Sequence, residues 1–272
     1  MQLLECVPNV SEGNNKDIID KLSHVISSVD GVKLLNVDSG KAANRTVFTF
    51  VGFAESVVEA AFRLFELASQ LISMENHKGQ HPRMGVVDVC PLIPIKDITI
   101  EQAQEYAEIL AQRVGSELQI PVYLYEQNAR FDYRKKLEQI RQGEYEGLAT
   151  KMILPEWIPD FGPSKFNSKT GACVIGARNF LLAFNINLQT KDVQIAKSIA
   201  AQIRESGGWY IAPNGEKLKS TGKFRGVKAL GWYISDFDVV QVSTNITSFN
   251  QISMARVFFE VSELALQYGT KV

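Results

Sequence analysis

The chain contains few of the residues that cross-link proteins or hold metal ions. Among its 272 residues there are only three cysteines and three histidines. The cysteines, Cys6, Cys90 and Cys173, lie far apart and show no CxxC spacing. Their odd number and mostly apolar surroundings predict reduced thiols, with neither disulfide bonds nor a zinc site.

Long apolar runs and a strong net charge are absent as well. No stretch approaches the ~18 to 20 apolar residues that a membrane helix needs. The first five residues, Met-Gln-Leu-Leu-Glu, show neither a basic region nor a long apolar run, so we expect no signal peptide and a cytoplasmic location. The formal net charge of −1 provides no basic field for nucleic acid or an anionic membrane. Because GxGxxG and P-loop patterns are missing, no nucleotide cofactor is expected.

The hydrophobic pattern of the first hundred residues predicts elements in the order β-α-β-β-α-β, in a globular α+β protein. The predicted strands are Leu3–Val7, Val32–Val37, Thr46–Val51 and Gly85–Ile95. One predicted helix begins at Asn15, and a second spans Glu55–Met74. This is the split βαββαβ unit of ferredoxin-like folds. A capping box at Thr99 and Gln102 predicts a further helix, and Pro121–Tyr125 a further strand.

A second unit of the same kind is predicted after a proline- and glycine-containing connection at residues 141–171. From Leu181 the order is again β-α-β-β-α, with residues 209–225 as a polar loop and no final strand before Val272. We therefore predict two ferredoxin-like subdomains, 1–171 and 172–272, the second lacking its last strand. The strand Ala172–Ile175 or a dimer partner is expected to cover its open edge.

The segment His77-Lys-Gly-Gln-His-Pro-Arg-Met-Gly85 is the most informative part of the chain. It holds two of the three histidines, and its glycines and proline break any helix. Three interpretations compete: a metal site, for which no third ligand is evident, a structural loop, and general acid–base chemistry. His81 is the better candidate for a base, because Pro82 restricts the backbone before it. His24, on the polar part of a predicted helix, is expected to be solvated.

Other polar residues lie where strands end. Asp38 closes the second predicted strand, and Asn44 and Arg45 open the third, positions that suit either ligand binding or turn capping. Near the histidines, Lys78 or Arg83 could hold a substrate carboxylate. Five cations lie within residues 217–228, either on a solvated loop or as a rim that attracts a polyanion: Lys217, Lys219, Lys223, Arg225 and Lys228.

Taken together, these stretches resemble the glutamate formiminotransferase family, nearly from end to end. The most specific blocks are residues 5–15, 44–52, 77–85, 88–91, 121–125, 159–164, 176–178, 183–187 and 241–243. The resemblance implies two ferredoxin-like subdomains and a homodimer. It also implies transfer of a formimino group from N-formimino-L-glutamate to N5 of tetrahydrofolate, the co-substrate, in histidine degradation, without a metal or a nucleotide.

The resemblance also assigns residues. The catalytic histidine falls on His81. From the positions described above, Asp38, Asn44, Arg45, His77 and Arg83 are expected to position substrate. The folate-contacting loop falls on Gly162, Pro163, Ser164, Lys165, Phe166, Asn167, Ser168, Lys169, Thr170 and Gly171. The family's usual C-terminal Gly-Ser-Glu segment does not occur in this sequence. An alternative function is therefore a folate-binding or regulatory relative with weak or lost turnover.

Overall fold

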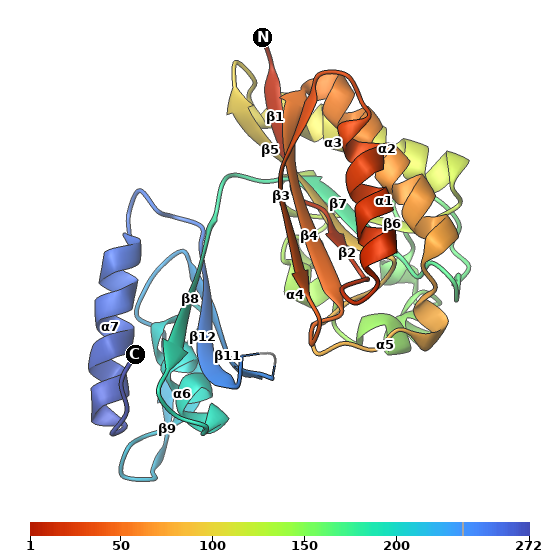
Figure 1. The fold of residues 1–272 in the computed structure, drawn as a ribbon. Helices are drawn as coiled ribbons and strands as arrows, with labels where there is room; N and C mark the ends of the chain where they lie inside the picture. The colour runs from red at the N-terminus through yellow and green to blue at the C-terminus, as the bar shows by residue number, and fades with distance from the viewer. Residues whose placement is uncertain (236) are drawn as a thin grey trace. The chain divides into compact units, whose positions relative to one another are not determined.

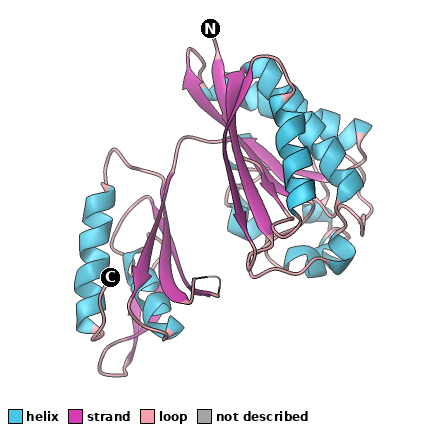
Figure 2. Cartoon of the chain, in the orientation of Figure 1, coloured by secondary structure: helices cyan, strands magenta, loops and turns pink. Residues whose placement is uncertain are grey.

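The computed structural model describes residues 1–235 and 237–272. The chain divides into two compact units, Met1–Asn179 and Phe180–Val272, and both combine helices with a sheet (Figures 1 and 2). The mixed α+β class predicted from the sequence is confirmed.

The first unit is built on one seven-stranded sheet. Its strands are β1 (Leu3–Cys6), β2 (Asn9–Val10), β3 (Val32–Gly40), β4 (Arg45–Phe53), β5 (Val87–Lys96), β6 (Val122–Leu124) and β7 (Cys173–Ala177). Strand β3 pairs with β4, and β1 and β2 both pair with β4 on one side and β5 on the other. Strands β7 and β6 continue the sheet beyond β5, in parallel. With β1 and β2 counted as one strand, the order is β-α-β-β-α-β, as predicted.

Amphipathic helices cover one face of this sheet. They are α1 (Lys16–Ser27), α2 (Ala54–Leu71) and α3 (Ile100–Glu117). Their apolar stripes pack on buried strand residues such as Phe48 and Phe50 in one continuous core. The predicted capping box is confirmed, because Thr99 and Gln102 each bond the other's backbone at the start of α3.

The opposite face of the sheet is only partly covered. Short helices, α4 (Leu137–Ile140) and α5 (Glu144–Lys151), contribute Ile140 and Leu148 to a smaller core against Val89 and Val174. Along β4, buried residues alternate with partly exposed ones that begin at Arg45. We call the side that carries Arg45 the open face of the sheet. Four short 3₁₀ helices complete the unit, at Met74–Asn76, Glu126–Asn128, Asp132–Arg134 and Pro155–Trp157.

Strand β7 corrects the predicted boundary between the units. We expected Ala172–Ile175 to open the second subdomain and, as one of two possible covers beside a dimer partner, to cover its open edge. Instead β7 lies between β5 and β6, with Val89 paired to Val174, so residues 172–179 belong to the first unit. The reason is that all five residues of β7 are buried, as is typical of an interior strand covered on both faces.

The second unit contains a three-stranded antiparallel sheet in the order β11-β12-β8. These strands are β8 (Leu182–Leu188), β11 (Val227–Ile234) and β12 (Val239–Ile246), and helices α6 (Val193–Ile203) and α7 (Met254–Gln267) pack on them. The predicted β-α-β-β-α order holds for β8, α6, β11, β12 and α7, with a further pair of strands between α6 and β11. Among the described residues, β8 pairs with a strand on one side only, so the second unit has an open sheet edge, as predicted.

The prediction of an irregular loop at residues 209–225 was wrong in part. Strands β9 (Gly208–Ile211) and β10 (Lys217–Ser220) form an antiparallel pair there. The aromatic residues Trp209 and Tyr210 favour a strand, and Gly215 permits the connecting turn with its φ of 87°. Lys217 and Lys219 therefore lie on a strand, close to the ring of Trp209.

The sheet of the second unit also carries a polar row on the face away from its helices. Trp232 donates a hydrogen bond from Nε1 to Gln241 Oε1 (3.2 Å), and Gln241 donates to Asn187 Oδ1 (2.8 Å). Ser243 Oγ donates to Asn185 Oδ1 (2.7 Å). Two sequence blocks of the family resemblance, residues 183–187 and 241–243, thus meet side by side.

Gly171 provides a test of how the first unit is held together. Its φ is 66°, and a methyl group there would overlap the carbonyl oxygen of Met84. We expect Gly171→Ala to lower the free energy of unfolding by more than the ~1 to 2 kcal/mol that a left-handed residue costs. Denaturant unfolding measures it. The control, Gly147→Ala, places a methyl group in open space on α5 and should be neutral or stabilising. Equal stability of the two variants would contradict the arrangement.

Candidate active site

Backbone hydrogen bonds place the two predicted site loops next to each other. The amide of Val86 donates to Thr170 O (2.9 Å), and the amide of Ala172 donates to Met84 O (3.1 Å). The amide of Met74 donates to Lys169 O (2.8 Å). The histidine loop, residues 77–85, and the loop at residues 162–171 therefore form one surface at the ends of β5 and β7.

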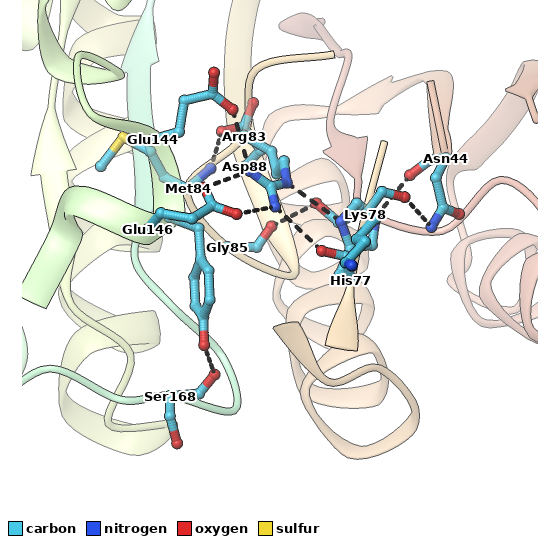
Figure 3. A network of polar contacts seen from close by, with 12 residues as sticks. Asn44, His77, Lys78, Arg83, Met84, Gly85, Asp88, Glu144, Glu146 and Ser168 are labelled. Atoms are coloured by element: carbon cyan, nitrogen blue, oxygen red, sulfur yellow. Dashed lines mark hydrogen bonds and ion pairs between the residues drawn. The ribbon is translucent and has the colours of Figure 1, made fainter. Parts of the chain in front are cut away.

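Arg83 holds the histidine loop in shape (Figure 3). Its guanidinium contacts Glu146 through two bonds (2.6 and 2.8 Å) and Glu144 through one (3.1 Å). The same group donates to the carbonyl oxygen of His77 (3.1 Å) and to its ring Nδ1 (3.3 Å). Because Arg83 is buried and its guanidinium already binds two carboxylates, the geometry favours a structural task over the predicted contact with substrate.

His77 and Asn44 connect this loop to the start of β4. The His77 Nε2 atom donates to the backbone carbonyl of Asn44 (2.9 Å), which leaves Nδ1 to accept from Arg83. Burial lowers the pKa of His77, and Arg83 lowers it further against the opposing bond to Asn44. The Asn44 side chain donates to Lys78 O (2.9 Å) and accepts from the Gly13 amide (3.0 Å), in a left-handed backbone conformation. Both side chains thus fix the loop.

His81 is held in a single neutral tautomer. Its Nδ1 lies 2.7 Å from the carbonyl oxygen of Pro82, which can only accept, so Nδ1 carries the proton. Its Nε2 lies 2.7 Å from Nη1 of Arg45, which can only donate, so Nε2 presents its lone pair. The pKa of His81 is lowered to about 3, mainly by burial and also by the positive charges of Arg45 and Arg141, against the opposing bond to Pro82. The ring is neutral at physiological pH.

The open face carries most of the groups around His81. Nη1 of Arg45 also donates to Asn9 Oδ1 (2.7 Å). Because Asn9 and Asp38 are both paired with Val47 across the sheet, their side chains lie on the same face as Arg45. Asp38 is exposed there. The structure therefore brings three predicted residues, Asp38, Arg45 and His81, to one face.

Three residues of this site were missed from the sequence: Asn9, Asp88 and Arg141. Arg141 forms an ion pair with the buried carboxylate of Asp88, and Asp88 also accepts from the Met84 amide (2.9 Å). An acidic residue within the apolar strand β5 was a usable signal, since a buried carboxylate needs a partner. Arg141 gave no comparable signal, because it follows α4 on an irregular segment.

The loop at residues 162–171 is well bonded within the first unit. Asn167 Oδ1 accepts from the Thr170 amide (3.2 Å), and Tyr145 donates from its hydroxyl to Ser168 O (2.6 Å). Ser168 Oγ donates to Glu75 Oε1 (2.7 Å). The residues of this loop that remain exposed are Gly162, Ser164, Lys165, Ser168 and Lys169. They provide a polar, cationic surface beside the histidine loop.

Neither a metal centre nor a membrane helix is found in the described residues. Across 1–235 and 237–272, no group of three or more His, Cys, Asp or Glu side chains is arranged to hold a metal ion. Over the same residues, no helix combines the length and the apolar character that crossing a membrane requires.

Acid unfolding tests the environment of His81. Its folded-state pKa of about 3 lies below the unfolded value of about 6.5, so the unfolded chain binds the extra proton between these values. His81 therefore contributes a loss of stability as the pH falls from about 6.5 toward 3. We expect His81→Gln, whose amide oxygen can still accept from Arg45, to show a shallower loss in denaturant unfolding between pH 6.5 and 4. A slope equal to that of the wild type would contradict the buried neutral ring.

Substitution of Arg83 separates the structural role from substrate binding. An ammonium group cannot reproduce the fork that contacts Glu146 and His77 together. We expect Arg83→Lys to lower the free energy of unfolding by about 1 kcal/mol or more, as measured by denaturant titration. Arg113→Lys is the control, since Arg113 lies on the surface of α3 with Glu59 and Glu117. Unchanged stability of Arg83→Lys together with weaker binding of substrate would contradict the structural role. It would support the contact between Arg83 and a substrate carboxylate that the sequence predicted.

Comparison with known proteins agrees with this division of the chain into two units. The family model described as "Formiminotransferase domain, N-terminal subdomain" matches residues 3–178. The family model described as "Formiminotransferase domain" matches residues 183–272. Similar proteins include a glutamate formimidoyltransferase of Streptococcus pyogenes serotype M1, 41% identical over 100% of this chain and 86% of that protein. Another, of Thermoplasma acidophilum, is 40% identical over 99% and 84%.

The longer relatives carry a second activity in their name. The formimidoyltransferase-cyclodeaminase of Mus musculus is 46% identical over 100% of this chain, but the match covers 48% of that protein. The chain thus spans about half the length of these relatives. Since the family models together match residues 3–178 and 183–272, the chain belongs to the formiminotransferase domain family.

Proposed function

We propose that this chain is a glutamate formimidoyltransferase, which moves the formimino group of N-formimino-L-glutamate to N5 of tetrahydrofolate. The observation that carries the proposal is the neutral imidazole of His81. Its Nε2 lone pair faces Arg45 on the open face, and its loop is joined by backbone bonds to the loop at residues 162–171. The names of the Streptococcus and Thermoplasma relatives support the reaction.

The reaction needs one group that moves a proton. A bond forms between N5 of tetrahydrofolate and the formimino carbon, and the bond between that carbon and the glutamate nitrogen breaks. N5 loses a proton as it attacks, and the glutamate nitrogen gains one as it leaves. A single histidine can take the first proton at Nε2 and deliver it to the leaving nitrogen. The Nδ1 bond to Pro82 keeps the ring oriented throughout.

The other predicted residues take supporting parts in this proposal. Arg45 and Asp38 contact substrate on the open face, while Asn44, His77 and Arg83 hold the loop that presents His81. The loop at residues 162–171 binds tetrahydrofolate, the co-substrate, and Lys165 and Lys169 offer positive charge to its carboxylates. We propose the same activity without a bound metal or nucleotide, in histidine degradation, by a cytoplasmic homodimer.

Replacement of His81 tests the proposed activity. A general base contributes about 10² to 10⁴-fold in rate, so His81→Gln should lower kcat for formimino transfer by that factor. Binding of tetrahydrofolate should stay within a few-fold, because the loop at residues 162–171 is unchanged. The assay follows 5,10-methenyltetrahydrofolate after acid cyclisation of the product.

The matched control is His24→Gln, on the exposed side of α1. It should leave kcat unchanged. Near-normal turnover of His81→Gln would overturn the assignment, and loss of turnover in His77→Gln alone would transfer the role to His77. Folate binding by the wild-type chain without any turnover would instead favour the non-catalytic relative.

A further inference from the structure

Arg45 is a partly buried cation that lacks a carboxylate partner. Across residues 1–235 and 237–272, no Asp or Glu side chain forms an ion pair with it. The buried or nearly buried guanidiniums of Arg83, Arg134 and Arg141 all have one. The hydrogen bonds of Arg45 go to two neutral groups, Asn9 Oδ1 and His81 Nε2.

A partly buried cation with neutral partners is costly to maintain. The pKa of Arg45 is lowered to about 10, mainly by burial and also by the charge of Arg141, while Asp88 and Asp38 oppose the shift. Arg45 nevertheless remains protonated at neutral pH. A partly buried, protonated guanidinium without a carboxylate partner favours binding of an anion, above all a carboxylate that it can contact through two parallel hydrogen bonds.

The same guanidinium blocks the atom that the reaction needs. His81 has one lone pair to offer, at Nε2, because Nδ1 carries the proton that bonds Pro82. That lone pair accepts from Nη1 of Arg45 at 2.7 Å. While this bond persists, the lone pair cannot take a proton from N5 of a substrate.

We propose that Arg45 exchanges partners during the reaction, leaving His81 Nε2 to bind a carboxylate of the formimino donor, so that donor binding releases the base. This inference rests on the proposed function and adds an order of events to it: the donor binds first, and His81 then becomes free to act as a base. A donor with a carboxylate activates His81, and a donor without one leaves Nε2 occupied. Arg141 does not exchange, because Asp88 holds it and the Met84 amide holds Asp88.

The exchange predicts how the charge of His81 responds to ligand. Four charged groups act on the ring or on its partner: Arg45, Arg141, Asp88 and Asp38. When Arg45 turns to a carboxylate, its positive charge is neutralised and its bond to Nε2 is lost. Both changes favour protonation, so the pKa of His81 should rise from about 3 toward the ordinary value of about 6.5.

The test uses L-glutamate, the product that carries the same two carboxylates, and does not depend on turnover. Proton NMR follows the ring resonances of the three histidines as a function of pH, assigned with His24→Gln, His77→Gln and His81→Gln. Saturating L-glutamate should raise the midpoint of His81 by at least one pH unit. Glutaminamide, which has no free carboxylate, should not.

Two variants sharpen the result. In Arg45→Gln the midpoint of His81 should already be raised without ligand, and L-glutamate should move it no further. Arg113→Gln, on the surface of α3, should behave as the wild type does. An unmoved His81 midpoint in the wild type would overturn the exchange, whether L-glutamate binds elsewhere or fails to bind.

This outcome is separate from that of the proposed function. Absence of formimino transfer by the wild type would overturn the proposed function, yet a glutamate-dependent rise at His81 would still support the exchange. Normal transfer with an unmoved His81 would retain the function and reject the exchange.

Discussion

The site depends on the parallel pairing of β5 with β7. This pairing aligns Val89 with Val174, and just before it the backbones of Met84 and Ala172 meet. Two loops that are far apart in the sequence are thereby joined through main-chain hydrogen bonds, which do not depend on particular side chains. The histidine loop is thus anchored to a buried interior strand, so its geometry follows from the core of the first unit.

A fixed acceptor at Nδ1 and a fixed donor at Nε2 determine what the neutral ring of His81 can do. A carbonyl at one nitrogen and a guanidinium at the other leave one possible tautomer for this partly buried ring. The arrangement orients the lone pair accurately but makes the ring a very weak base. Under the proposed function, such a ring becomes an effective base only when its electrostatic environment changes, so catalysis would depend on the charge of the ligand.

Local sequence patterns predicted much of the fold. They did not predict which strands and charged residues pair across long separations in the sequence. The alternation along Arg45–Phe53 and the capping box at Thr99 both depend on neighbouring residues, so the sequence alone was sufficient. A short apolar strand such as β7 fits either sheet, and only tertiary packing decides between them. The same holds for the site: the histidine loop was recognisable, whereas the ion pair of Arg141 with Asp88 joins residues 53 positions apart.

The account rests on the protonation of one imidazole in the free protein. Long-range ¹H–¹⁵N NMR of the histidine rings at pH 7 measures it directly. A protonated Nδ1 with an Nε2 that bears a lone pair and accepts a hydrogen bond is the result expected for His81. A ring protonated at Nε2, or at both nitrogens, would contradict the account, because neither form can accept a proton at the atom that faces Arg45.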